Sequence, residues 1–167
     1  VGDPLGRVDA EDKVLALDGY CDDFKVEGML YGVALRPEFP RILIKDIDYS
    51  DALKLEGVVK IITADDVPGN RFCGHLKKDW PALIAIGEET RYVGDTIALV
   101  VAEEEETARK AVNLIKVDYD KLSPMTSPED SLKDGAPELH KGGNILTREV
   151  LKRGNVDEAI KNSKYVV

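Results

Sequence analysis

The side chains best suited to catalysis or metal binding in this sequence are two histidines and two cysteines. Cys73 and His75 flank Gly74, an order that could place a thiol nucleophile beside a base. Adjacent positions do not normally converge for catalysis, and no third residue that would orient the histidine can be named. His140 stands in a different loop, with no cysteine or histidine near it in the sequence. We therefore interpret both histidines as solvated loop side chains.

The cysteines do not form a recognisable metal or redox motif. Cys21 and Cys73 make no CxxC pair, and no two histidines stand at ligand spacing. We interpret both as reduced structural thiols of a cytoplasmic protein, with a disulfide between them left open. Phosphate-binding glycine loops and the sequence motifs of zinc proteases and serine hydrolases are also absent. The sequence therefore predicts no catalytic, cofactor-binding or metal-binding residue.

Two polar segments have a functional and a structural interpretation. Residues 92–95, Tyr-Val-Gly-Asp, precede an apolar run and could form a ligand loop, although a glycine turn that leads into a strand is favoured. Residues 103–106 are all glutamate and could bind a metal or a partner. The favoured interpretation is a solvated first turn of a helix, where the helix dipole stabilises negative charge.

Composition narrows the class of protein. A chain of 167 residues buries about 70% of its unfolded surface, enough for one sizeable core or two small lobes. The formal net charge of −9 argues against a general nucleic-acid binder, and Lys77-Lys78 is too small a basic patch to change that. No apolar run has the length of a membrane span, and no secretory signal is present. We expect neither a nucleic acid nor a membrane as partner.

The clearest structural pattern is a strand, a helix and a second strand between residues 97 and 119. Residues 97–102 are all apolar, as expected for a strand covered on both faces. Residues 116–119 form a second, short strand. Between them the spacing of apolar side chains predicts an amphipathic helix whose buried face comprises Ala108, Ala111, Val112 and Ile115. Glu105 with Arg109 and Glu106 with Lys110 are favourable i, i+4 pairs on this helix.

The other elements are short and irregular in order, which favours an α+β fold. Residues 41–48 alternate imperfectly, which indicates a bulged strand. Residues 69–91 form a long segment of little periodicity, typical of a functional loop. A helix capped by Asn155 should turn Val156, Ala159 and Ile160 inward. Further strands are expected at 29–35, 58–62 and 145–151, with short helices at 50–56, 63–66 and after Ser127.

Two parts of the chain can be distinguished. Residues 1–24 are polar and irregular, and we expect an extended N-terminal arm there. Residues 25–167 are expected to form a single domain, because no linker or internal repeat interrupts them. The sequence ends in a β-prone run, whereas natural termini are usually polar. We therefore expect a fragment of a longer chain.

Six short sequence segments (here called phrases), which together span essentially the whole chain, resemble the sequences of one protein family. The family is that of the molybdenum hydroxylases, which includes xanthine dehydrogenase and aldehyde oxidase. The segments occur in the order found in the N-terminal α/β hammerhead domain of its large subunit. No single phrase is diagnostic, and the order of all six makes the resemblance specific. The phrases are VGDPLGRVD at 1–9, GMLYGVALR at 28–36, RIL and DID within 41–48, GVVKIITADDVPGN at 57–70, RYVGDTIALVVAE at 91–103 with VDY at 117–119, and GNVDEA at 154–159.

The resemblance implies an oxidoreductase that hydroxylates a carbon of a purine or an aldehyde, with water as the oxygen source. In the family a molybdenum–pterin centre performs the reaction, and iron–sulfur clusters and often FAD carry electrons away. The family's pterin contacts and catalytic glutamate belong to later domains, so no catalytic role transfers to a residue here. Two distant cysteines cannot hold a cluster that needs four ligands.

Two hypotheses follow. In the first, the chain is the leading structural domain of such an enzyme, inactive alone, and packs against the downstream molybdenum-binding domains and an iron–sulfur subunit or domain. In the second, it is a stand-alone interaction module that recruits an electron-transfer subunit through residues 69–91. The sequence favours the first, because the motifs of the catalytic half of the enzyme are missing.

Overall fold

A three-stranded antiparallel sheet forms the centre of the structure, a computed structural model that describes residues 2–17 and 19–167. The strands are β1 (Tyr31–Leu35), β3 (Val58–Ile62) and β6 (Ala98–Ala102), in the order β1-β6-β3. Val100 pairs with Val33 on one side and with Ile61 on the other. The apolar run predicted as a strand therefore lies in the middle of the sheet, where both edges of its backbone are hydrogen-bonded.

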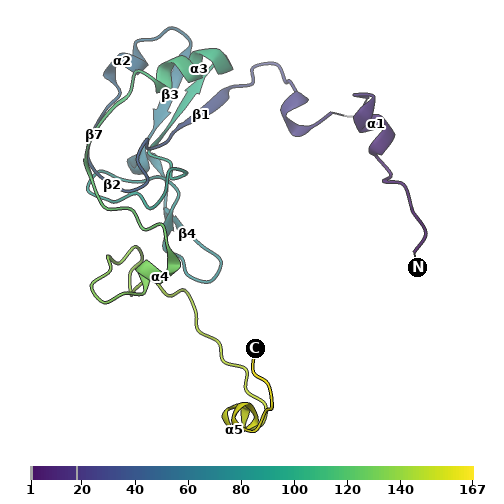
Figure 1. Ribbon diagram of the computed structural model, residues 1–167. Coiled ribbons are helices and arrows are strands. Elements are labelled where there is room, and N and C mark those ends of the chain that lie inside the picture. Colours follow the sequence, from purple (N-terminus) through teal and green to yellow (C-terminus); the bar gives the residue numbers. More distant parts are fainter. Residues whose placement is uncertain (1, 18) are drawn as a thin grey trace.

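Helix α3 (Glu105–Val112) covers one face of this sheet (Figure 1). Ala98, Val100 and Ala102 are fully buried beneath Ala108 and Ala111 of the helix. The predicted ion pairs form on its exposed side, with Arg109 2.6 Å from Glu105 and Lys110 2.7 Å from Glu106. The acidic run is thus the solvated start of a helix, as expected.

The other face of the sheet is less covered than the sequence predicted. In β6, burial alternates along the strand, with Leu99 and Val101 only half-buried. Glycine and alanine oppose them on β1, at Gly32 and Ala34, so little side-chain volume is available to shield them. The run 97–102 was expected to be buried on both faces; within β6 only one face is fully buried, whereas Ile97, just before the strand, is buried in a second cluster.

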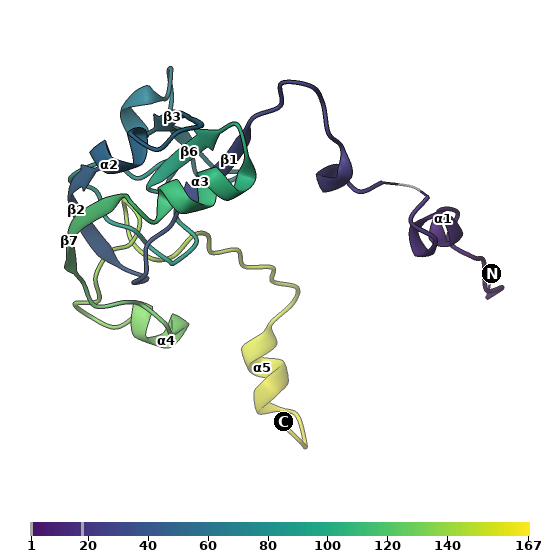
Figure 2. The ribbon, with the colours of Figure 1, turned by 90° about the horizontal axis from the view of Figure 1, so that it is seen from above.

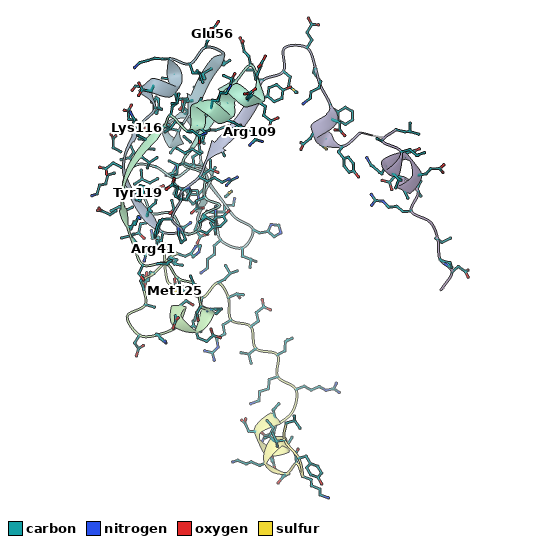
Figure 3. The ribbon with its side chains drawn as sticks, turned by 45° about the horizontal axis from the view of Figure 1, so that its top comes forward. Arg41, Glu56, Arg109, Lys116, Tyr119 and Met125 are labelled. Carbon is teal, nitrogen blue, oxygen red and sulfur yellow. The ribbon has the colours of Figure 1, made fainter. Side chains whose placement is uncertain are left out.

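A second sheet pairs β2 (Ile42–Asp48) with β7 (Lys116–Lys121) in antiparallel fashion. The register shifts between Ile44 and Asp46, which confirms the bulge predicted in this strand. Ile42 and Ile44 pack with Ile84 and Ile97 in a second buried cluster beside the first. Lys116 and Tyr119 mark the outer strand of this sheet in Figure 3.

Short elements link the two sheets. Helix α2 (Ser50–Leu53) and the 3-10 turn η2 (Ala64–Asp66) lie where the sequence placed helical turns. In η2 the Asp66 carboxylate accepts hydrogen bonds from the backbone N–H of Thr63 at 2.9 Å and from its hydroxyl at 3.3 Å. The long segment 69–91 contains a small hairpin of β4 (Phe72–Cys73) and β5 (Trp80–Pro81). Short antiparallel strands and few helices confirm the α+β class.

Both ends of the chain extend away from these sheets (Figures 1 and 2). The N-terminal part carries α1 (Ala10–Val14) and the 3-10 turn η1 (Cys21–Asp23), and the C-terminal part carries α4 (Pro128–Ser131) and α5 (Val156–Lys161). None of these four elements contains a buried residue. The division into an arm of residues 1–24 and a domain of residues 25–167 stays a prediction.

Two expectations for the C-terminal part are wrong. Residues 145–151 form no strand: they pair with none of the three sheets of the described residues. Helix α5 is capped by Asn155 as predicted, but its apolar side chains do not face inward: Val156 is 45% exposed and Ile160 49%. None of the six residues of this helix is buried against another element of the described chain. Among the described residues, no helix has the length and apolar character that a membrane crossing requires.

Candidate functional site

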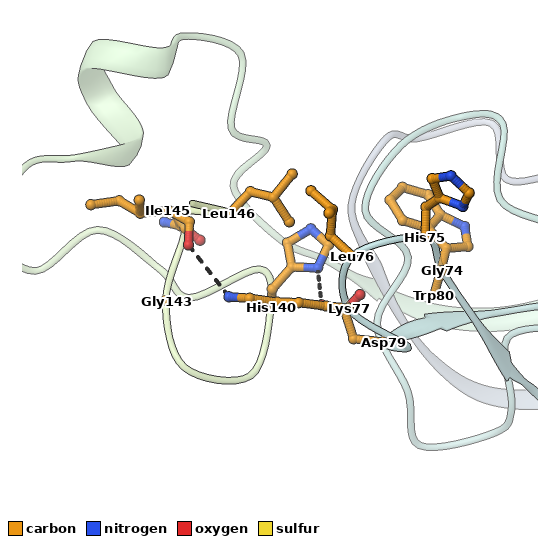
Figure 4. A pocket seen from close by; sticks show the side chains of 11 residues that line it. Gly74, His75, Leu76, Lys77, Asp79, Trp80, His140, Gly143, Ile145 and Leu146 are labelled. Carbon is orange, nitrogen blue, oxygen red and sulfur yellow. Dashed lines mark hydrogen bonds and ion pairs between the residues drawn. The ribbon is translucent and has the colours of Figure 1, made fainter. Parts of the chain in front are cut away.

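A mostly apolar cavity of about 350 Å³ opens between two loops that are distant in the sequence. One wall is the tip of the β4–β5 hairpin, residues 74–80, and the other is the segment 140–146 (Figure 4). A larger and more polar hollow of about 670 Å³ lies along β1 and the N-terminal part. The apolar cavity is the better candidate site because ligand pockets combine an apolar lining with few polar groups. Its lining includes His75, Leu76, Lys77, Trp80, His140 and Leu146.

An aspartate–histidine pair joins the two walls. The Nδ1 atom of His140 lies 2.8 Å from a carboxylate oxygen of Asp79, and the two side chains are 30% and 27% exposed. The hydrogen bond from His140 holds the pKa of the Asp79 carboxyl below its usual range. An ionised carboxylate only accepts hydrogen bonds, so Nδ1 carries the hydrogen in this pair.

Arg91 connects the same two walls through hydrogen bonds to backbone carbonyls. Its Nε donates to the carbonyl of Leu139 at 2.7 Å, and its Nη1 donates to the carbonyl of Asp79 at 3.1 Å. The guanidinium lies 5.5 Å from the centre of the Trp80 ring, within range of a cation–π contact. Tyr92 meets the same ring edge-on, at 5.5 Å between ring centres and an angle of 69°. Trp80 is therefore fixed by two neighbours.

Asn144 stabilises the conformation of the wall formed by residues 140–146. Its Oδ1 accepts from the backbone N–H of Leu139 at 2.8 Å, and its Nδ2 donates to the carbonyls of Pro137 at 2.9 Å and Ser131 at 3.0 Å. A single side chain thus satisfies three backbone groups, one at the end of α4 and two in the irregular segment that follows it. Such groups would otherwise have to bond to water.

Lys77 contributes the cation nearest the cavity. Its Nζ lies 3.5 Å from the carbonyl of Ile145, at the limit of a hydrogen bond (Figure 4). Among the described residues it forms no ion pair, whereas Asp79 on the same loop is engaged by His140. The cavity therefore has an apolar lining and one ammonium group without an acidic partner in the described part of the chain.

The structure brings both histidines of the sequence to one cavity, a proximity that their loop positions did not indicate. Cys73 lies next to it, where its thiol donates to the Trp80 carbonyl at 3.3 Å. Cys21 is exposed in the N-terminal part, and both cysteines are free, so the disulfide left open by the sequence does not form. Sequence reasoning missed the roles of Arg91 and Asn144, because hydrogen bonds from a side chain to distant carbonyls leave no pattern in the sequence.

The segment 92–95 is a tight turn before β6. Asp95 is 2% exposed; one of its carboxylate oxygens accepts from the backbone N–H of Arg91 at 2.6 Å, and the other, Oδ1, is buried without a partner among the described residues. A side chain at Gly94 would collide with the Tyr92 ring. Arg36 donates to the carbonyl of Gly94 and ties the turn to the end of β1. The favoured structural interpretation of this segment agrees with these contacts.

In the described part of the chain, the ligating side chains are not arranged as a metal site. Within residues 2–17 and 19–167, no group of three or more His, Cys, Asp or Glu side chains is placed to hold a metal ion. An iron–sulfur cluster needs about four cysteine or histidine ligands, and the sequence has two cysteines, one of them in the N-terminal part and one in the hairpin. The described residues do not fit an iron–sulfur cluster.

Comparison with known proteins reveals close sequence relatives. Residues 2–123 match the family profile described as aldehyde oxidase and xanthine dehydrogenase, a/b hammerhead domain. The chain is 43% identical over 161 residues to a probable xanthine dehydrogenase subunit of Bacillus subtilis (strain 168), covering 96% of this chain and 21% of that protein. It is 34% identical over 169 residues to the xanthine dehydrogenase molybdenum-binding subunit of Escherichia coli O157:H7, covering 96% and 22%.

Solved structures agree with these relatives. Quinoline 2-oxidoreductase from Pseudomonas putida 86 superposes on all of this chain and on 22% of its own, with a TM-score of 0.81 and 29% identity. Aldehyde oxidoreductase from Desulfovibrio gigas covers 81% of this chain and 16% of its own, with a TM-score of 0.74 and 33% identity. The chain spans about a fifth of the length of the curated relatives that it matches.

Proposed function

Since the chain belongs to the aldehyde oxidase and xanthine dehydrogenase family, through its a/b hammerhead domain, we propose that it is the N-terminal structural domain of a molybdenum-dependent hydroxylase. The observation that carries the proposal is the 43% identity to a probable xanthine dehydrogenase subunit over 96% of the chain. The family and the hammerhead fold expected from the six sequence phrases are both confirmed. The substrate class that we propose is a purine or an aldehyde.

In this proposal the reaction takes place outside the chain. A molybdenum–pterin group, when bound in such an enzyme, supplies the oxidation of a carbon centre, and iron–sulfur clusters, often with FAD, accept the electrons. Among the described residues no three His, Cys, Asp or Glu side chains are placed to hold a metal ion, and two cysteines cannot supply the ligands of an iron–sulfur cluster. The domain therefore supports the molybdenum-binding domains and docks an iron–sulfur partner, and alone it is inactive.

Exposed apolar side chains at both ends support a packing role. Val8 and Leu151 are fully exposed, and Leu5 and Tyr165 are 92% and 78% exposed. Figure 3 shows the side chains of both end segments projecting with no other element beside them. Apolar surface of this kind is normally covered by a partner. The free and exposed thiols of Cys21 and Cys73 suit a reducing compartment, so we place the enzyme in the cytoplasm.

The test uses the protein that the native gene encodes. We expect it to contain molybdenum in a stoichiometric amount and, together with an iron–sulfur domain or partner subunit, to oxidise xanthine or an aldehyde, while the 167-residue chain contains no molybdenum and has no activity. Turnover by the 167-residue chain alone would contradict the structural role. A native product that lacks molybdenum but forms a stable complex with an iron–sulfur protein would instead support a stand-alone interaction module.

A further inference from the structure

We propose that the cavity between residues 74–80 and 140–146 binds a small aromatic carboxylate. This inference rests on the lining of the cavity and is independent of the proposed enzyme. The occupant has a ring that packs on the apolar wall and an anionic group that meets Lys77. No molybdenum or iron–sulfur chemistry is involved, because the binding is reversible and non-covalent.

The apolar part of the lining accounts for the ring. Leu76 is 71% exposed and Leu146 is 58% exposed, and both project at the cavity from opposite walls (Figure 4). Trp80 closes the same space with an indole that Arg91 and Tyr92 already hold in place. A volume of about 350 Å³ lies in the range of small-ligand sites. A flat ring that covers the two leucines would remove apolar surface from water.

The polar part of the lining selects the charge of the ligand. The Lys77 ammonium has only the Ile145 carbonyl, 3.5 Å away, as a partner in the described part of the chain. The acidic side chain on the same wall, Asp79, is hydrogen-bonded to His140, and no ion pair joins it to Lys77 among the described residues. A carboxylate would give the ammonium the charge-assisted hydrogen bond that it lacks. A second lysine, Lys78, is exposed and does not line the cavity.

The net charge of −9 works against an anion only at long range. Exposed charges farther away than a Debye length, about 8 Å at physiological salt, are largely screened. Within that distance the lining carries two charged side chains, Lys77 and Asp79, and the Asp79 carboxylate is hydrogen-bonded to His140 whereas the ammonium of Lys77 has only a carbonyl as partner among the described residues. The walls also need little reorganisation, because Arg91 and Asn144 fix both loops through hydrogen bonds to backbone carbonyls. A preorganised site loses less conformational freedom when the ligand binds.

Trp80 makes the proposal directly measurable, since it is the single tryptophan of the chain and lines the cavity. We expect benzoate to change the tryptophan emission of the 167-residue chain in a saturable way. Benzamide, which has the same ring without the charge, should bind about tenfold more weakly, because hydrogen bonds to charged groups are the stronger ones. Acetate, which has the charge without the ring, should give no saturable change.

Two matched pairs of variants locate the binding. Lys77→Met should raise the dissociation constant for benzoate about tenfold, and Lys78→Met should leave it unchanged. Leu146→Asp should abolish binding by placing an anion beside the carboxylate, whereas Leu151→Asp, at a fully exposed position away from the cavity, should not. These positions are exposed, so the folded state is expected to persist, and thermal unfolding checks it. The proposal is overturned if benzoate gives no saturable change, if benzamide binds equally well, or if the two lysine variants behave alike.

Discussion

The ion pair between Arg71 and Glu88 makes stability depend on pH. The two terminal guanidinium nitrogens of Arg71, Nη2 and Nη1, donate to the Glu88 carboxylate at 2.6 and 2.8 Å. Arg71 Nη1 also donates to the carbonyl of Leu83. The bond from Arg71 lowers the pKa of Glu88, and a backbone N–H, from Ala85, acts in the same direction. A carboxyl whose pKa is lower in the folded state contributes stability above its ordinary pKa, and that contribution is lost as the pH falls through the folded value.

We therefore expect Arg71→Met to lower the free energy of unfolding at neutral pH by about 1 kcal/mol, after allowing for solvent at the partly exposed Glu88. The difference from the wild type should begin to shrink as the pH falls below about 4.3, the ordinary pKa of a glutamate, and should vanish only below the lower pKa that Glu88 has in the folded wild type. Urea unfolding of both proteins at several pH values measures this difference in the free energy of unfolding. Arg148→Met, at an exposed position, is the control. A difference that is constant with pH would show that the ionised carboxylate is not its source.

Asn144 provides a second test at a single side chain. Asn144→Ala removes the three hydrogen bonds that shape residues 131–144. We expect amide exchange in this segment to become at least about tenfold faster, since local opening no longer breaks these bonds. The melting temperature should change little, because the segment is not part of either buried cluster. Asn162→Ala, at an exposed position after α5, should leave exchange there as it is, and equal exchange in both variants would contradict the role of Asn144.

Strand β6 carries the stability of the whole sheet. Val100 is 0% exposed and lies between β1, β3 and α3, so Val100→Asp would bury a charge with no partner. We expect this variant not to fold. Val59→Asp, at a 52% exposed position of the edge strand β3, should fold with a modest loss of stability. Circular dichroism and thermal unfolding distinguish the two. A normal melting temperature for Val100→Asp would mean that the core is not centred on β6.

The difference between β6 and α5 explains how far the sequence predicts the fold. Residues 97–102 and the following helix leave a strong apolar pattern because their burial depends on neighbours along the chain. Helix α5 has a similar local pattern, yet its burial depends on an element that is not beside it. The cavity left no pattern at all, since it is formed by loops far apart in sequence that Arg91 and Asn144 hold through backbone carbonyls. The local periodicity of apolar residues therefore predicts helices and strands. Hydrogen bonds between side chains and backbone groups far apart in the sequence cannot be predicted in this way.

The described part of the molecule divides into a packed body and two exposed ends. Every buried hydrophobic side chain lies between Ile42 and Ile115, and residues 147–167 are exposed throughout. The body contains the two adjacent clusters under α3 and between the sheets. Because burial of apolar surface is the main source of stability, the body should determine how the whole chain unfolds.

Removal of residues 147–167 should therefore leave the unfolding of the body unchanged. The deleted segment contains only exposed residues, and the Lys77 contact to the Ile145 carbonyl remains in the shortened chain. We expect the melting temperature to stay within about 2 °C of the intact chain, which corresponds to at most about 1 kcal/mol for a chain of this size. In contrast, Ile44→Ala in the second cluster should cost about 2–5 kcal/mol and lower the melting temperature clearly. Differential scanning calorimetry compares the two. If the deletion were as damaging as the core substitution, residues 147–167 would have to pack on the body, and the exposed apolar side chains of α5 would then belong to its fold rather than to a partner's surface.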